Sequence, residues 1–114
     1  MPAKTLKAPS HLTPETAAWW RSVQEDYAIE PHHAKLLVLA CEAFDRCQQA
    51  RALIDAHGPV VATSDGGMKA HPAVAIERDA RLAFARLLRE LDLDTEPPAE
   101  RARPPALRSN RRGG

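Results

Sequence analysis

Apolar residues recur in steps of three and four along two long stretches of the chain, at about residues 32–57 and 72–91. These steps match the 3.6-residue turn of an α-helix, so each stretch predicts a long helix with one apolar stripe. The first stripe consists mostly of small residues: Leu36, Ala40, Ala43, Cys47, Ala50 and Ile54. The second stripe consists of Ile76, Ala80, Ala83, Leu87 and Leu91. Because small side chains let helices approach closely, we expect an antiparallel helical pair.

The residues between the two long helices have the pattern of a β-hairpin. Gly58-Pro59 ends the first helix, and Pro72 begins the second. Between them, Asp65-Gly66 separates two short β-prone runs, which is a hairpin signal. Because an isolated two-stranded hairpin is marginally stable in water, we expect this one to rest on another surface.

A shorter helix is expected before the pair. Thr13 can cap its first turn, Pro14 suits the first helical position, and the apolar spacing extends the helix to about Tyr27. Trp19 and Trp20 lie about 100° apart around this helix, so they cannot both point into one small core. Aromatic residues make up only 4% of the chain, which predicts a thin core that gains from self-association. The alternative is a monomer with one exposed tryptophan.

The fold class that follows is mainly α, with three helices of which a long antiparallel pair is joined by a short β-hairpin. A chain of 114 residues forms one small domain and excludes a two-domain enzyme. We expect this domain over residues 13–94, after a flexible basic arm at residues 1–12. Residues 95–114 are rich in proline and arginine, a composition that predicts a disordered tail.

The cysteines and the hydropathy of the chain indicate a cytoplasmic protein. Cys41 and Cys47 are six residues apart on one expected helix, so they face different sides and no disulfide between them is expected. Reduced cysteines that face the core are ordinary in the cytoplasm. No apolar run approaches the length of about 18 residues that a membrane span needs, and the first residues lack the apolar stretch of a signal peptide.

The net charge of +1 is unevenly distributed along the chain. Residues 1–8 carry +2, residues 9–94 carry −4 and residues 95–114 carry +3. An acidic middle between two basic ends favours tails that contact a polyanion or an acidic protein surface. The alternative is that the basic ends only keep the protein soluble.

No residue pattern indicates catalysis or a bound cofactor. The five histidines and two cysteines include no pair with the His-x-x-x-His or Cys-x-x-Cys spacing that places two metal ligands on one face. The segment Asp65-Gly66-Gly67-Met68-Lys69 lacks the spacing of a nucleotide-binding loop, and no serine has the signature of a nucleophile. We therefore expect no enzyme, no metal site and no cofactor.

The first two expected helices meet in a short turn that contains Pro31. This is the order of a helix-turn-helix, although a plain helical corner has the same pattern. The long helix carries no dense row of arginine and lysine, so any DNA contact is expected to be mostly to phosphate groups. The residues predicted to make these contacts are Lys4, Lys7, Arg21, Lys35 and Lys69.

Five segments carry a further signal through their order along the chain. They are Pro9-x-His11-Leu12, residues 20–27, Leu36-Leu37-x-x-Ala40-Cys41-Glu42-Ala43-x-Asp45-Arg46, Gly66-Gly67-x-Lys69-Ala70-His71-Pro72-Ala73, and residues 77–93, which end in Glu90-Leu91-Asp92-Leu93. In this order, over about residues 9–94, the chain resembles the small subunit of tailed-phage terminases. The proline-rich end departs from many members: Ala99-Glu100-Arg101-Ala102-Arg103 is the nearest equivalent of their Ser-Arg-Ala-Arg-Leu-like stretch.

The resemblance implies a packaging role without catalysis. Small terminase subunits recognise the viral genome, form rings and regulate the large subunit, which holds the ATPase and the nuclease. The implied partners are double-stranded phage DNA, the terminase large subunit and further copies of the chain, in the cytoplasm of the bacterial host. The arginines of the tail are expected to engage the large subunit or DNA: Arg101, Arg103, Arg108, Arg111 and Arg112. The alternatives are a small dimeric helix-turn-helix transcription regulator and a helical adaptor that binds no nucleic acid.

Overall fold

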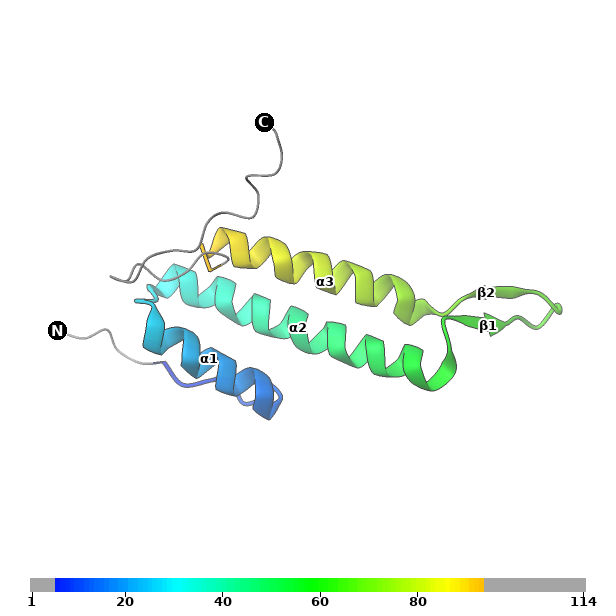
Figure 1. The fold of residues 1–114 in the computed structure, drawn as a ribbon, viewed down its shortest axis with the longest axis horizontal. Helices are drawn as coiled ribbons and strands as arrows, with labels where there is room; N and C mark the ends of the chain where they lie inside the picture. The colour runs from blue at the N-terminus through cyan, green and yellow to red at the C-terminus, as the bar shows by residue number, and fades with distance from the viewer. Residues whose placement is uncertain (1–5, 94–114) are drawn as a thin grey trace, which may run out of the picture.

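Proline opens each of the three helices that the computed structural model describes within residues 6–93 (Figure 1). The helices are α1 (Pro14–Asp26), α2 (Pro31–His57) and α3 (Pro72–Glu90). Proline fits the first helical position because the N–H that it lacks would have no partner within the helix. The predicted mainly α fold is confirmed. The expected boundaries differ by one residue, because Tyr27 and Leu91 are C-cap residues and α2 already begins at Pro31.

α2 and α3 run antiparallel and form the most extensive contact between elements of the described chain (Figure 1). Ala40 and Ala50 of α2 and Ala80 of α3 are buried, so small residues form this contact, as the sequence predicts. Ile76, by contrast, is 44% exposed, and Ala83 is also exposed. The prediction that both belong to a buried stripe is wrong, because the contact covers a narrow part of the surface of α3 and leaves the adjacent side chains open.

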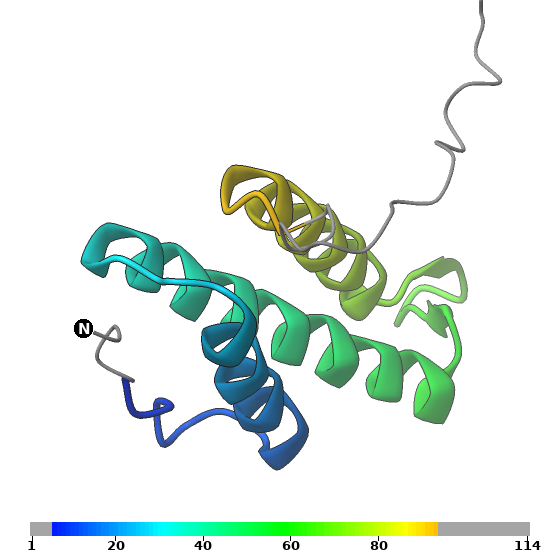
Figure 2. The same ribbon diagram turned by 60° about the vertical axis from the view of Figure 1, so that its left-hand side comes forward.

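α1 lies across α2, and the main core forms where these two helices meet the end of α3 (Figure 2). Its buried residues are Leu12, Trp20, Val23, Leu37, Ala40, Cys41 and Leu91. The Trp20 indole N–H donates to the backbone oxygen of Leu6 at 3.0 Å. Trp19 is half-buried and packs instead on Phe84 of α3, with ring centroids 5.7 Å apart. Both tryptophans pack within one protomer. The exposed tryptophan of the alternative is therefore not found, and the two side chains give no evidence for self-association.

The hairpin consists of β1 (Val60–Ala62) and β2 (Met68–Ala70), which pair antiparallel in the register Val60↔Ala70, Val61↔Lys69 and Ala62↔Met68. Gly66 has a φ of 89°, a conformation that favours glycine. The hairpin projects beyond the end of the helical pair (Figure 1), and its strand residues are exposed except for Val61, which is half-buried. The surface on which the sequence predicts it to rest is therefore not found among the described residues of the same protomer.

Cys41 and Cys47 are free thiols and both are buried. They do not pair with each other, as their spacing predicts. Burial, with a smaller contribution from the nearby Asp45 carboxylate, raises the pKa of Cys41 to about 12, which makes this thiol unreactive at neutral pH. None of the helices described between residues 6 and 93 has the length and apolar character of a membrane span.

Candidate nucleic-acid and subunit interfaces

Four of the five lysines and arginines that the sequence assigns to DNA lie within the described residues: Lys7, Arg21, Lys35 and Lys69. All four are exposed. Within residues 6–93, none of them forms a salt bridge. Their charges are therefore open to a polyanion. Lys4 lies outside the described residues, as do the tail arginines Arg101, Arg103, Arg108, Arg111 and Arg112.

Hydrogen bonds place Lys7 beside α1. The backbone N–H of Leu6 donates to Oε1 of Gln24 at 2.7 Å, and the Leu6 oxygen accepts from Nε2 of Gln24 at 3.0 Å. The same oxygen accepts from the Trp20 indole. Arg21 follows Trp20 directly and lies one helical turn before Gln24. Lys7 and Arg21 are therefore held at the same end of the molecule.

Lys35 belongs to the same end, because it lies in the second turn of α2, close to where α1 ends. We call Lys7, Arg21 and Lys35 the basic corner. Lys69 lies on β2 at the opposite end, since α2 extends about 33 Å from Lys35 to His57 at 1.5 Å per residue. Within one protomer, the four described residues of the predicted DNA-binding set therefore divide into a corner of three and one distant lysine.

A buried carboxylate fixes α1 on α2 and thereby holds the basic corner in shape. Asp45 of α2 is 7% exposed. Its Oδ1 accepts from Oγ1 of Thr16 at 2.5 Å and from Oγ1 of Thr13 at 2.9 Å, and its Oδ2 accepts from the Thr13 N–H at 3.0 Å. Burial alone would raise the pKa of Asp45, but the hydrogen bonds from Thr16 and Thr13 outweigh it and lower this pKa.

A second carboxylate joins α2 to α3 closer to the hairpin. Glu77 Oε2 accepts from Nη2 of Arg51 at 2.8 Å, from Nε of Arg81 at 3.3 Å and from Sγ of Cys47 at 3.5 Å. The hydrogen bond from Arg51 is the main cause of the lowered pKa of Glu77. The i, i+4 spacing of Glu77 and Arg81 is a local sequence signal, whereas the bond to Arg51 crosses between helices and has no such signal.

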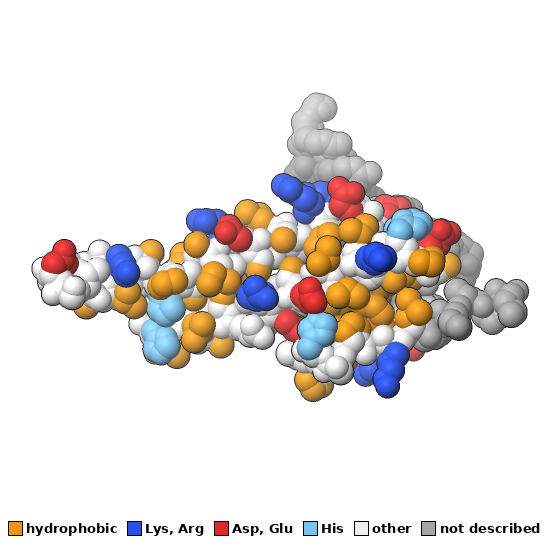
Figure 3. Space-filling model, turned by 180° about the vertical axis from the view of Figure 1, so that it is seen from behind, with side chains coloured by type: hydrophobic (Ala, Val, Ile, Leu, Met, Phe, Trp, Pro, Cys, Tyr) orange, Lys and Arg blue, Asp and Glu red, His pale blue; other side chains and the backbone are white. Residues whose placement is uncertain are grey.

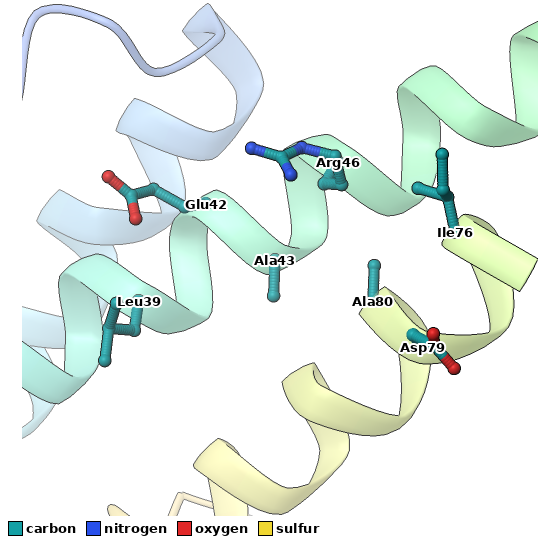
Figure 4. A pocket seen from close by; sticks show the side chains of 7 residues that line it. All are labelled: Leu39, Glu42, Ala43, Arg46, Ile76, Asp79 and Ala80. Carbon is teal, nitrogen blue, oxygen red and sulfur yellow. The ribbon is translucent and has the colours of Figure 1, made fainter. Parts of the chain in front are cut away.

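An open groove of about 410 Å³ lies between α2 and α3 (Figure 4). We call it the α2–α3 groove; its lining residues are Leu39, Glu42, Ala43, Arg46, Ile76, Asp79 and Ala80. Ala43 and Ala80 form its floor, and Leu39, 51% exposed, and Ile76 form its apolar sides. Figure 3 shows further apolar side chains along the face of the molecule seen from behind. Acidic and basic groups are interspersed with them on this surface.

Arg46 is a cation that the sequence pattern did not single out. It is exposed, lines the α2–α3 groove and forms no salt bridge with any residue in the described range 6–93. Lys35 and Arg46 are eleven residues apart, close to three full turns, so both lie on the same side of α2. The spacing of these two cations on one side of a helix can be read from the sequence. It is hard to recognise there, because acidic residues outnumber basic ones in the middle of the chain.

The fold defines a small helical protein with an exposed basic corner and an open groove of mixed character. In the part of the chain that the structure describes, no three histidine, cysteine or acidic side chains are grouped closely enough to hold a metal ion.

The model of the family described as phage terminase, small subunit, matches residues 17–109. The chain therefore belongs to the phage terminase small-subunit family, and the resemblance seen in its sequence is confirmed. No curated protein and no solved structure matches the chain.

Proposed function

We propose that the chain recognises viral DNA for the packaging terminase, forms a ring and regulates the large subunit. The family match makes it a small subunit of phage DNA packaging. In the proposal, the large subunit supplies the ATPase and the nuclease, the small subunit contributes no catalytic residue, and both act in the cytoplasm of the bacterial host. The observation that carries the DNA-binding part is the basic corner, whose three cations have no acidic partner among residues 6–93.

Binding to the phosphate backbone fits this corner better than reading of bases. Three exposed cations on different segments suit separate contacts to phosphate groups, whereas base readout needs several residues of one element in a groove. Few contacts per protomer make each interaction weak. A ring repeats the corner in every subunit, and this multivalency raises the overall affinity. In the proposal, Lys4, which lies outside the described residues, also contacts DNA, and Lys69 adds a contact from the other end.

Salt titration of DNA binding tests the corner. The variant with Lys7→Ala, Arg21→Ala and Lys35→Ala is compared with wild type on double-stranded phage DNA between about 50 and 200 mM salt. Each lost phosphate contact lowers the slope of log affinity against log salt by about 0.9, so we expect a weaker affinity and a shallower slope. Arg78→Ala is a matched control, since Arg78 is an exposed cation that pairs with Asp79. Unchanged affinity and slope in the triple variant would contradict the proposal.

The second part of the proposal concerns the tail. Its five arginines, Arg101, Arg103, Arg108, Arg111 and Arg112, outnumber Glu96 and Glu100 and give residues 95–114 a net charge of +3. This charge suits an acidic surface of the large subunit or DNA. Deletion of residues 95–114 is expected to reduce either stimulation of the large subunit or DNA binding. If both remain intact, the tail has neither role.

One observation favours a second candidate, a dimeric helix-turn-helix regulator. α1 and α2 are joined by only four residues, 27–30, as in that motif. The two functions differ in stoichiometry and in specificity. Native mass spectrometry of the intact assembly separates them: about eight to ten subunits would support the packaging ring, and a dimer with nanomolar preference for one short palindrome would support the regulator.

A further inference from the structure

The hairpin has one face made entirely of apolar side chains. Alternate residues of a strand point to the same side, and the register pairs Val60 with Ala70 and Ala62 with Met68. These four side chains therefore share one face, and all four are exposed, Met68 at 66% and Val60 at 49%. Such a face on a two-stranded hairpin that projects from the molecule is unstable in water without a cover.

The α2–α3 groove has the complementary shape. Its alanine floor leaves about 410 Å³ open, and its sides are Leu39 and Ile76. Two strands lie about 4.8 Å apart, so the cross-strand pair of Ala62 and Met68 forms a compact apolar patch that can pack over the groove. Methionine is unbranched and flexible, which lets Met68 fill an irregular apolar space of this kind.

Charges flank both surfaces. The groove is lined by Glu42, which pairs with His11, by Asp79, which pairs with Arg78, and by Arg46, which has no salt bridge within residues 6–93. In the hairpin, the Asp65 carboxylate accepts hydrogen bonds from the Thr63 hydroxyl and the Gly67 N–H within its own turn. Lys69 carries the remaining charge of the strands, and within residues 6–93 no carboxylate pairs with it. Lys69 lies between Met68 and Ala70 and points to the opposite face of the hairpin, but its long side chain can bend around the strand edge to an acid at the rim of the groove.

We infer that the apolar face of the hairpin of one copy docks in the α2–α3 groove of the next copy. This inference rests on the proposed ring and specifies its subunit contact. The two surfaces are different and lie on different parts of the protomer, so the contact is heterologous: each copy gives its hairpin to one neighbour and receives that of the other. A heterologous contact that repeats around an axis closes a ring in which no copy of either surface is left uncovered. The groove carries two carboxylates, Glu42 and Asp79, against one arginine, Arg46, so it suits an apolar hairpin face better than it suits DNA.

Cysteine cross-linking of the full chain tests this contact. Two double variants place one thiol on the hairpin and one in the groove: Met68→Cys with Leu39→Cys, and Met68→Cys with Ile76→Cys. All three positions are exposed, and the native Cys41 and Cys47 are buried, so oxidation reports on the new thiols. Under mild oxidation we expect a ladder of covalent oligomers that ends at the ring size. The pair Met68→Cys with Leu53→Cys is the matched control, since Leu53 is 45% exposed on α2 but outside the groove.

Each cysteine substitution made alone tests for a different contact between two copies of the chain. Covalent dimers from Met68→Cys alone would mean that hairpins pair with each other, and covalent dimers from Leu39→Cys alone would mean that grooves face each other; either result overturns the inference. A ring by native mass spectrometry without a ladder also overturns it, while the proposed function stands. A wild-type chain that stays monomeric at high concentration contradicts the ring and the docking together.

A charge exchange provides a second test that does not depend on oxidation. Lys69→Glu places an acid near Asp79 across the proposed contact, and we expect assembly to need about tenfold higher protein concentration. Combination with Asp79→Lys restores the opposite charges and is expected to recover most of the loss. Failure of the second substitution to compensate, with both variants folded by circular dichroism, would show that these residues do not face each other.

Discussion

The helical pair formed by α2 and α3 has one surface covered by α1 and another left open, and the two surfaces differ in the side chains that line them. On the covered surface, Trp19 of α1 packs on Phe84, which packs on Phe44 at 5.4 Å between ring centroids. On the open surface, Leu39 and Ile76 flank Ala43 and Ala80 and are themselves 51% and 44% exposed. The first surface is completed by large aromatic side chains of the same chain. The second has small residues, two exposed apolar side chains and mixed charges, with no aromatic side chain among its lining residues.

The largest expected effect separates the two surfaces directly. Trp20→Ala removes a side chain that is 2% exposed and should lower the free energy of unfolding by about 3–5 kcal/mol. Leu39→Ala on the open surface should change it by no more than about 0.5 kcal/mol in dilute solution. Urea denaturation of both variants at the same low protein concentration measures the difference. Equal losses would mean that the open surface is already covered within one protomer.

The next effect concerns the polar contact under α1. Asp45→Ala leaves the hydroxyls of Thr13 and Thr16 without their shared acceptor in a buried place, and should cost about 2–3 kcal/mol of unfolding free energy. The comparable acid on the open surface is Glu42, which pairs with the exposed His11. Glu42→Ala is therefore the matched control and should change stability little. A similar loss in both variants would show that burial of Asp45 is not what makes its contacts strong.

The same carboxylate makes stability depend on pH. The pKa of Asp45 is lowered in the folded protein, so the unfolded chain binds this proton more readily and folding releases it. The resulting stabilisation is fully present above the ordinary aspartate pKa near 3.8 and is lost as the pH falls through the lower folded value. Unfolding free energies measured from about pH 5 downward should therefore fall more steeply for wild type than for Asp45→Asn. Parallel curves for the two proteins would refute this assignment.

The sequence predicts the parts of this fold that depend on neighbouring residues. Pro14, Pro31 and Pro72 mark the helix starts, and Asp65-Gly66 marks the hairpin turn, because each acts through its own backbone conformation. The hydrogen bond between Asp45 and Thr13 joins residues 32 positions apart, and no local pattern indicates it. The apolar spacing also does not predict that Ile76 is exposed. Spacing gives the direction in which a stripe of side chains faces, but not the width of the helix contact that buries it. In the candidate DNA site, the positive charge of the residues predicts correctly that their side chains are exposed. Their separation into the basic corner and the distant Lys69 depends on the length of α2, which charge does not indicate.

The smallest predicted effect lies at the base of the hairpin, where the proposed subunit contact begins. His71 is the N-cap of α3: its Nδ1 accepts from the Ala73 N–H at 2.9 Å, and its ring stacks on His57 with centroids 5.4 Å apart. His71→Ala removes both contacts and should lower the free energy of unfolding by about 1 kcal/mol. His71→Asn supplies another capping side chain, so it should recover the part of the loss that comes from the cap, and thermal denaturation of the two variants measures that part. If Asn is no better than Ala, stacking on His57 rather than capping orients the hairpin relative to α3.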